Sequence, residues 1–374
     1  METSIFAVAA LGAVALVLLV VGQAVYLACV VSWADRRTAG MAYCGAPAAE
    51  RRRFKRRLAW HAWALSPLLN WFALQKRFRF RDATFCYRGV PGPAAGSCSP
   101  ETFEAATLYE PRADDVFVVT QMRSGTTWMQ HLVFQLLSRG ERDLAAEQTT
   151  LNAISPWLES NRTVGVADAP LVGQSPCARI IKTHLPASLC PFDARAKYVY
   201  VVRSPTGCFA SCVDFVRNNA GRFRVSLEDA LEWFTSDDLM WWGDWVEHVV
   251  GWRDRAAESD NVLVVRFEDM QSDLPGVAAR VAGFLGIADL DDAALARCVA
   301  RCGFDYMKRN EDVFEMHPPH LLQRPGGFLV SGVAKRHEAV PAALRERLLA
   351  GRRAELARRG RSLADLYPEL AFDA

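Results

Sequence analysis

The chain begins with a long hydrophobic segment. Residues 5–31 carry no charge, and polarity enters this run only through two glycines, Gln23 and Tyr26. The run exceeds the ~20 residues that a helix needs to cross the hydrocarbon core of a bilayer. A secretory signal would combine a basic start with an apolar region of roughly 7–15 residues, whereas this chain starts METS. We therefore predict an uncleaved transmembrane anchor over residues 1–35.

A second segment alternates basic and aromatic side chains. Residues 51–82 begin RRRFKRRLAWHAW, so that arginine and lysine flank tryptophan and leucine. Such a segment can lie in the membrane interface, or it can be an ordinary amphipathic helix packed on a domain. Residues 89–100, rich in Gly, Pro and Ser, are expected to form a linker or long loop. Residues 36–100 are thus interpreted as a juxtamembrane segment and linker.

From residue 101 to the end, short β-branched runs alternate with helical stretches. The pattern predicts strands at 115–120, 179–182, 197–202 and 262–267, and helices at 127–137, 205–218 and 274–285. Continuous apolar strands separated by helices favour a parallel sheet covered on both faces. We predict an α/β fold with a P-loop-like parallel sheet in one domain, 101–374, preceded by one transmembrane helix. Ligands of such folds bind at the carboxyl ends of the strands.

The distribution of charge bears on membrane orientation. The N-terminal side of the apolar run carries Glu2 and no basic side chain, whereas Arg36, Arg37 and the basic run 51–57 follow it. The positive-inside rule therefore puts the rest of this single-pass membrane protein on the cytoplasmic side. The alternative is a domain in the Golgi lumen, which the sequon at Asn161 would favour.

Composition adds little about ligands. The net charge of +2 gives no indication of nucleic acid, and we predict no nucleic-acid partner. The ten cysteines are scattered, with Cys208/Cys212 and Cys298/Cys302 spaced four apart, and no CxxC or His/Cys cluster suggests a metal site. We expect buried free thiols, as in a reducing compartment.

The stretch TQMRSGTTW, residues 120–128, is a candidate anion-binding loop. It joins a predicted strand to a predicted helix, where backbone N–H groups and the helix dipole favour an anion. Gly125 lets the backbone come close, and charge or hydroxyl groups come from Arg123, Ser124, Thr126 and Thr127. Against GxxxxGK[ST], Thr120 replaces the first Gly and Thr126 the Lys, so this is not the usual triphosphate loop. The alternative is a helix N-cap built from Ser and Thr.

Two further elements follow strands. In RSPTGCFAS, Arg203 closes a strand and Ser211 lies about two turns into the next helix, so both could reach one phosphate. In KTHLP, Lys182 and His184 project to the same side of an extended chain. His184 is a candidate general base, and Lys182 a cation for developing negative charge. A structural histidine and a surface arginine are the alternatives.

These three elements together resemble the PAPS-dependent sulfotransferase family, in particular its cytosolic type, which acts on small alcohols, phenols and amines. Three more blocks occur in the family's order: WGDWVEHVVGW, RFEDM and RPGGFLVSGVAK. The resemblance covers roughly residues 101–370.

The resemblance implies a role for each matching residue. The 5′-phosphosulfate would be bound by Arg123, Ser124, Gly125, Thr126 and Thr127, and the 3′-phosphate by Arg203 and Ser211. The nucleotide would also contact Trp128, Phe304, Arg324, Gly326 and Phe267, which stands where many relatives have Tyr. His184 would be the general base, with Lys182 and Arg123, usually Lys in the cytosolic enzymes, stabilising charge on the departing oxygen. PAPS would be the co-substrate, and no metal is required.

We therefore expect a sulfotransferase that transfers a sulfuryl group to a hydroxyl or amine of a small or lipid-like acceptor. A P-loop nucleotide kinase and a non-catalytic nucleotide-binding membrane protein are the alternatives. The acceptor is expected to contact loops 141–175 and 305–323, with apolar side chains from Trp157, Phe314, Leu321 and Leu322. The family's dimer motif is incomplete, with Ala339 and Leu344 at two of its positions, so the oligomeric state stays open.

Overall fold

The centre of the molecule is a four-stranded sheet with strand order β4-β3-β5-β6. The computed structural model describes residues 2–36, 46–64, 76–94, 97–174, 176–219, 223–315, 329 and 340–367. The strands are β3 (Asp115–Thr120), β4 (Arg179–Thr183), β5 (Lys197–Val202) and β6 (Val262–Arg266). All three neighbouring pairs are parallel, so the carboxyl ends of the strands lie along one edge.

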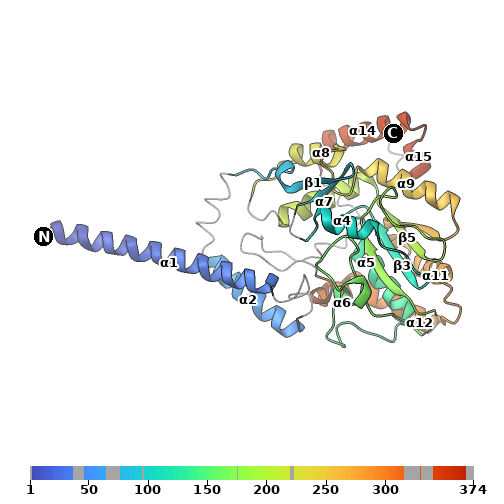
Figure 1. Cartoon of the computed structure of the whole chain (residues 1–374), viewed down its shortest axis with the longest axis horizontal. Coiled ribbons are helices and arrows are strands. Elements are labelled where there is room, and N and C mark those ends of the chain that lie inside the picture. The colour runs from blue at the N-terminus through green and yellow to red at the C-terminus, as the bar shows by residue number, and fades with distance from the viewer. Residues whose placement is uncertain are drawn as a thin grey trace.

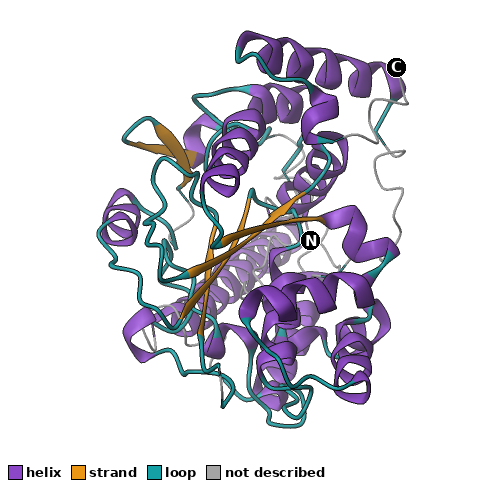
Figure 2. Cartoon of the chain, turned by 90° about the vertical axis from the view of Figure 1, so that its right-hand side faces the viewer, coloured by secondary structure: helices purple, strands orange, loops and turns teal. Residues whose placement is uncertain are grey.

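Helices cover both faces of this sheet, as predicted (Figures 1 and 2). Successive strand residues point to opposite faces, so Phe117 and Val118 of β3 belong to two different hydrophobic clusters. The first cluster is closed by α7 (Pro205–Asn219), α8 (Leu227–Thr235), α9 (Trp245–Glu258) and α14 (Ala342–Arg358). The second is closed by α5 (Thr126–Leu137), α11 (Leu274–Leu285) and α12 (Asp292–Cys302).

Short helices connect these layers. They are α4 (Pro100–Thr107), α6 (Leu151–Ile154), α10 (Phe267–Ser272), α13 (Phe304–Arg309), α15 (Leu363–Leu366) and the 3-10 turns Arg81–Ala83, Val166–Asp168 and η3 (Glu311–Val313). The predicted strands and helices are present within one residue at each end. β6 ends one residue early, because Phe267 turns out of the strand and begins α10.

A hairpin occupies part of the predicted linker. β1 (Thr84–Tyr87) pairs antiparallel with β2 (Val90–Pro93). All four residues of β2 are buried, and a Cβ on Gly92 would come within 2.3 Å of the Phe85 ring. The linker prediction for 89–100 is therefore wrong at β2, where glycine and proline allow close packing of a strand rather than a flexible connection.

The N-terminus forms two helices at one end of the molecule. Helix α1 (Glu2–Arg36) projects from the rest of the chain (Figure 1). Its stretch Phe6–Gln23 has a mean hydropathy of 2.4 and none of it is buried. By length and composition this helix can cross a membrane, which is weak evidence for the predicted anchor, and its orientation stays a prediction. Helix α2 (Ala48–Ala64) follows.

Candidate active site

The carboxyl ends of the four strands bring the predicted site residues together. The loop 121–125 follows β3, His184 follows β4, Arg203 follows β5 and Phe267 follows β6. Because β3 lies between β4 and β5, the loop has the histidine on one side and the arginine on the other. Segments distant in sequence thus meet at one edge of the sheet.

The loop between β3 and α5 has an unusual backbone conformation. Arg123 and Gly125 have φ angles of 64° and 102°, in the left-handed region. A Cβ on Gly125 would come within 2.7 Å of the Phe267 ring, so glycine is required there. No side chain caps α5, which removes the alternative of an ordinary Ser/Thr N-cap. The first N–H groups of the helix and its dipole are therefore available for an anion.

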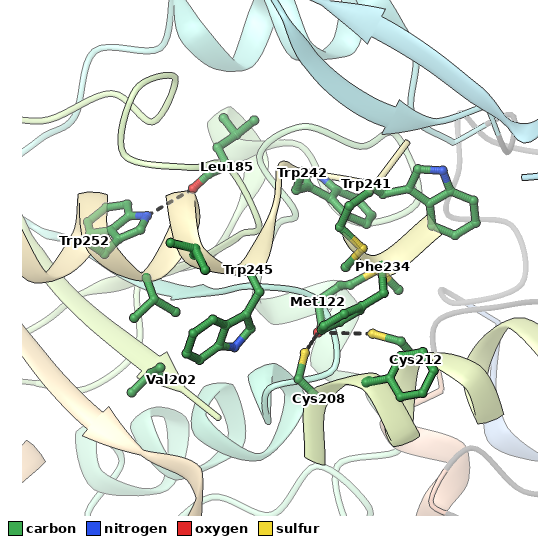
Figure 3. Close-up of a cluster of buried hydrophobic side chains, with 14 of the residues drawn as sticks. Met122, Leu185, Val202, Cys208, Cys212, Phe234, Trp241, Trp242, Trp245 and Trp252 are labelled. Carbon is green, nitrogen blue, oxygen red and sulfur yellow. Dashed lines mark hydrogen bonds between the residues drawn. The ribbon is translucent and has the colours of Figure 1, made fainter. Parts of the chain in front are cut away.

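Two cysteine thiols of α7 hold the backbone of this loop in place. Met122 O accepts hydrogen bonds from Cys208 Sγ at 3.3 Å and Cys212 Sγ at 3.8 Å, both on α7 (Figure 3). Ser124 Oγ contacts Cys208 Sγ at 3.7 Å. Both cysteines are fully buried, so the prediction of buried free thiols is confirmed at these positions, and α7 fixes the position of the loop backbone.

The predicted phosphate residues contact one another. Arg203 Nη1 donates to Arg123 O at 2.9 Å, and Arg123 Nε donates to Ser211 Oγ at 3.4 Å. The Arg123 guanidinium also lies over the Phe215 ring, 5.0 Å from its centroid. Two fixed cations and a buried hydroxyl therefore gather beside the loop, a set of donors suited to phosphate.

Aromatic side chains flank these cations. The Arg203 guanidinium lies 4.1 Å from the centroid of the Phe267 ring, and Trp128 meets that ring edge-on at 5.8 Å. Trp128 Nε1 donates to Cys302 O at 2.8 Å, two residues before Phe304, which begins α13 and is exposed. The structure thus brings the predicted adenine contacts to the α10–α13 side of the loop. Thr126 is more internal, with its hydroxyl 2.6 Å from that of Thr120, and Thr127 is half-buried.

His184 is held as a neutral imidazole. Its Nδ1 lies 2.9 Å from Thr120 O. Nδ1 also lies 3.1 Å from the Thr120 hydroxyl. A carbonyl oxygen can only accept and a hydroxyl can accept as well as donate, so a hydrogen on Nδ1 satisfies both contacts and leaves the lone pair on Nε2. Burial, followed by the nearby Lys182 charge, lowers the pKa of His184 well below its usual value. The ring packs against Trp157 and Trp242, at centroid distances of 5.4 and 4.8 Å.

Lys182 shares this environment. Its Nζ lies 3.5 Å from the centroid of the Trp157 ring. Burial lowers the pKa of Lys182 to about 7, although the carboxyl of Glu159 opposes this shift. Desolvation in turn raises the pKa of Glu159. A buried cation beside a neutral imidazole is a combination that can stabilise negative charge while a proton is removed.

Three residues outside the predicted set hold the catalytic segment: Glu159, His248 and Trp252. Glu159 accepts hydrogen bonds from His184 N at 2.7 Å and from the Thr183 hydroxyl at 2.8 Å. His248 Nε2 donates to His184 O at 3.0 Å, and Trp252 Nε1 donates to Leu185 O at 3.2 Å (Figure 3). The backbone of His184 is therefore fixed on both sides. His248 and Trp252 lie within WGDWVEHVVGW, a block that gave no individual roles in the sequence.

Several expected residues lie elsewhere. Arg324, Gly326, Leu321 and Leu322 are outside the described residues. Phe314 is fully buried in the second hydrophobic cluster against His131, at 4.8 Å between centroids, so its predicted role in the acceptor pocket is wrong. A groove of about 980 Å³ is lined by residues of 76–83 and 223–239 and includes none of the predicted site residues.

Sequence comparisons place the chain among known enzymes. Residues 113–337 match the family model described as the sulfotransferase domain. The chain is 31% identical over 265 residues to sulfotransferase 2B1 of Mus musculus, covering 69% of this chain and 75% of that protein. It is 29% identical to the 3-alpha-hydroxysteroid sulfotransferase of Cavia porcellus, covering 67% and 85%.

Solved structures agree on the fold. Mouse sulfotransferase SULT7A1, complexed with PAP, superposes with a TM-score of 0.56 at 21% identity, covering 72% of this chain and 94% of that one. Retinol dehydratase in a complex with retinol and PAP also gives a TM-score of 0.56, at 22% identity and with coverage of 67% and 83%. With the domain match spanning most of the sheet and the site, this chain belongs to the sulfotransferase family.

Proposed function

We propose that the protein transfers a sulfuryl group from PAPS to a hydroxyl or amine of a small, lipophilic acceptor, with His184 as the general base. The observation that carries this proposal is the meeting of a neutral His184, buried Lys182 and the Arg123/Arg203/Ser211 cluster at one edge of the sheet. A nucleotide-binding scaffold alone would need neither the histidine nor the lysine.

The residues present fit a nucleotide with a 5′-phosphosulfate and a 3′-phosphate. The Gly125 position has no room for a Cβ beside Phe267, as expected where the backbone approaches a ligand. Arg123, Ser124 and the start of α5 would hold the 5′ end, and Arg203 with Ser211 the 3′-phosphate. PAPS supplies the activated sulfuryl group, and several solved relatives contain PAP.

Each side chain then has a distinct task. His184 Nε2 takes the proton from the acceptor, while Nδ1–H stays fixed on Thr120 O. Lys182 and Arg123 stabilise charge on the departing oxygen. Glu159 and His248 keep the imidazole oriented through the His184 backbone. These contacts reduce the reorganisation needed during the reaction.

Replacing Arg203 by methionine is expected to weaken PAPS binding by roughly 10- to 100-fold, since a charge-assisted phosphate contact is lost. Methionine retains apolar contact with Phe267, so the fold should persist. The measurement compares KM for PAPS and for adenosine 5′-phosphosulfate, which lacks the 3′-phosphate. The variant should lose its preference for PAPS, and an unchanged preference would contradict the assignment of Arg203.

The pH dependence of kcat/KM for PAPS should follow the protonation state of Lys182. With its pKa near 7 in the unliganded protein, kcat/KM for PAPS should fall as pH rises above about 7, because the ammonium loses its proton. On the acid side the profile should show no decline at the ordinary histidine pKa of about 6.5, because the pKa of His184 lies well below that value. Lys182→Arg stays charged and should lack the alkaline decline. A wild-type profile that is level up to pH 9 would refute this role.

The acceptor and the membrane side are the remaining parts of the proposal. Buried Trp157 and Trp242 beside His184 are apolar surfaces at the reacting end of the site, and steroid sulfotransferases are among the relatives. Labelled PAPS incubated with membrane lipid extracts should give labelled apolar alcohols, and transfer only to polar sugars would contradict this acceptor class.

The side of the membrane on which the domain lies is tested separately. Protease treatment of intact vesicles should digest a cytoplasmic-facing domain and spare a lumenal one.

Binding measurements separate this function from a kinase. The protein should bind 3′,5′-ADP more tightly than ATP, because Arg123 is proposed to hold the 5′-phosphate and Arg203 the 3′-phosphate, which ATP lacks. Tighter binding of ATP would favour a P-loop kinase instead.

A further inference from the structure

Helix α2 attaches to the catalytic domain through one face. Arg51 and Leu58 are buried on this face, and Arg51 Nη1 donates to Asp312 O in η3. Lys55 pairs with Asp312 at 2.7 Å and with Glu315 at 2.6 Å. The helix is therefore a docked part of the domain rather than a loose tether.

The charge state of Lys55 supports this docking. Burial disfavours its ammonium, but hydrogen bonds and attraction from Asp312 and Glu315 outweigh that effect and raise its pKa. The ion pairs therefore persist at neutral pH. Since Glu315 O also accepts from Asn152 Nδ2 at 2.9 Å, α2 is linked through Glu315 to α6, the short helix that precedes Trp157.

The opposite face of α2 has a different composition. A residue advances about 100° around a helix, so positions 52, 56, 60 and 63 fall within one side, away from positions 51, 55 and 58. Trp60 and Trp63 are 66% and 77% exposed, far more than expected for tryptophan in a folded domain. The same side carries exposed Arg53, Arg56 and Arg57, whereas the exposed Arg52 at its edge pairs with Asp312 at 3.5 Å.

We propose that this arginine–tryptophan face of α2 binds the surface of a bilayer that contains anionic lipid. Tryptophan is favoured at headgroup depth, where its ring is apolar and its N–H is hydrated. Arginine forms forked hydrogen bonds with phosphate, and basic residues near a membrane are attracted by anionic headgroups. No acidic side chain other than Glu50 occurs on this helix.

The position of the helix supports a membrane as the occupant. Helix α2 lies at the end of the molecule from which α1 projects (Figure 1). If α1 spans the bilayer, a helix that begins twelve positions beyond its end, at Ala48, is kept near the membrane surface. Because the other face of α2 holds η3 and Glu315, the membrane surface would be placed at a fixed side of the catalytic domain. This inference is independent of the sulfuryl-transfer proposal.

Tryptophan emission in nanodiscs tests this proposal on the full chain. Nanodiscs contain phosphatidylcholine and phosphatidylserine, with or without bromine on the acyl chains. The difference in emission between wild type and Trp60→Phe/Trp63→Phe isolates the two tryptophans. We expect bromination to quench most of that difference. Omission of phosphatidylserine should largely restore it, and quenching that is equal without anionic lipid would overturn the anionic-surface assignment.

Charge-reversal variants provide the matched comparison. The same difference in emission is measured in the Arg53→Glu/Arg56→Glu background, with and without Trp60→Phe/Trp63→Phe. In this background, bromination should no longer quench the emission of Trp60 and Trp63. Arg347→Glu/Arg353→Glu makes the same change in net charge on exposed positions of α14 and should behave as wild type. If brominated lipid leaves the Trp60/Trp63 emission unchanged, the face lies in water and the proposal is overturned in favour of a protein partner.

Discussion

Replacing His184 by alanine is expected to lower kcat for sulfuryl transfer by about a thousandfold, the usual contribution of a general base. The reason is the tautomer: Thr120 O fixes the hydrogen on Nδ1, so Nε2 is the atom that can accept a proton. Affinity for 3′,5′-ADP should stay within a few-fold, because the proposed nucleotide contacts come from the loop after β3 and from α7 rather than from His184.

Acceptor acidity makes this test specific for proton removal. Phenols with electron-withdrawing substituents are already ionised at neutral pH and need no base, so the loss in His184→Ala should shrink as the acceptor pKa falls. His184→Asn keeps a donor that can reach Thr120 O and should be equally inactive, which separates loss of the base from loss of structure. Thermal unfolding of both variants checks the fold. Full activity in either variant would exclude His184 from the mechanism.

The sheet and the residues at its edge were accessible from the sequence. Runs such as KYVYVV are buried on both faces, so their continuous hydrophobicity identifies parallel strands without any contact information. RSGTT, KTH and RSP each follow such a run, and parallel strands place their carboxyl ends together. The meeting of Arg123, His184 and Arg203 therefore follows from topology.

The contacts that hold the His184 backbone could not be predicted from the sequence. Glu159 occurs in a loop whose sequence suggests a variable acceptor segment, yet it is fully buried against the His184 backbone. Only the return of residues 156–158 alongside β4 brings it there, through Leu158 N donating to Lys182 O. Similarly, the aromatic character of Phe314 predicts an apolar surface but cannot distinguish a substrate pocket from the core.

One face of helix α2 packs on the domain, which is one of the two alternatives that the sequence left open, and the other face is the one proposed to bind the membrane. A run of basic and aromatic residues is compatible with both a membrane surface and a domain surface. Arg51 and Lys55 contact Asp312 of η3 and Leu58 is buried, whereas Trp60 and Trp63 are exposed. The decisive information is the burial of each helix face, because composition averages the two faces together.

Replacing Arg123 by alanine is expected to reduce kcat/KM by roughly 100- to 1,000-fold, the effect of removing one preorganised group that stabilises transition-state charge. Arg123 has a left-handed backbone and contacts Ser211, and its carbonyl accepts from Arg203. It therefore joins the loop proposed for the 5′-phosphosulfate to the two residues proposed for the 3′-phosphate. Arg123→Lys keeps the charge but loses the forked geometry, so we expect a loss of about tenfold or less.

Arg142 offers a control for the side chain's packing. Its guanidinium lies 5.2 Å from the Phe134 ring centroid, much as Arg123 lies over Phe215, but it is paired with Glu147 on the surface. Arg142→Ala should leave kcat/KM unchanged. If Arg123→Ala affected only stability, both variants would retain activity at low temperature, and charge at position 123 would have no part in the reaction. A loss in Arg123→Ala that Arg123→Lys largely restores would instead identify the charge itself as the requirement.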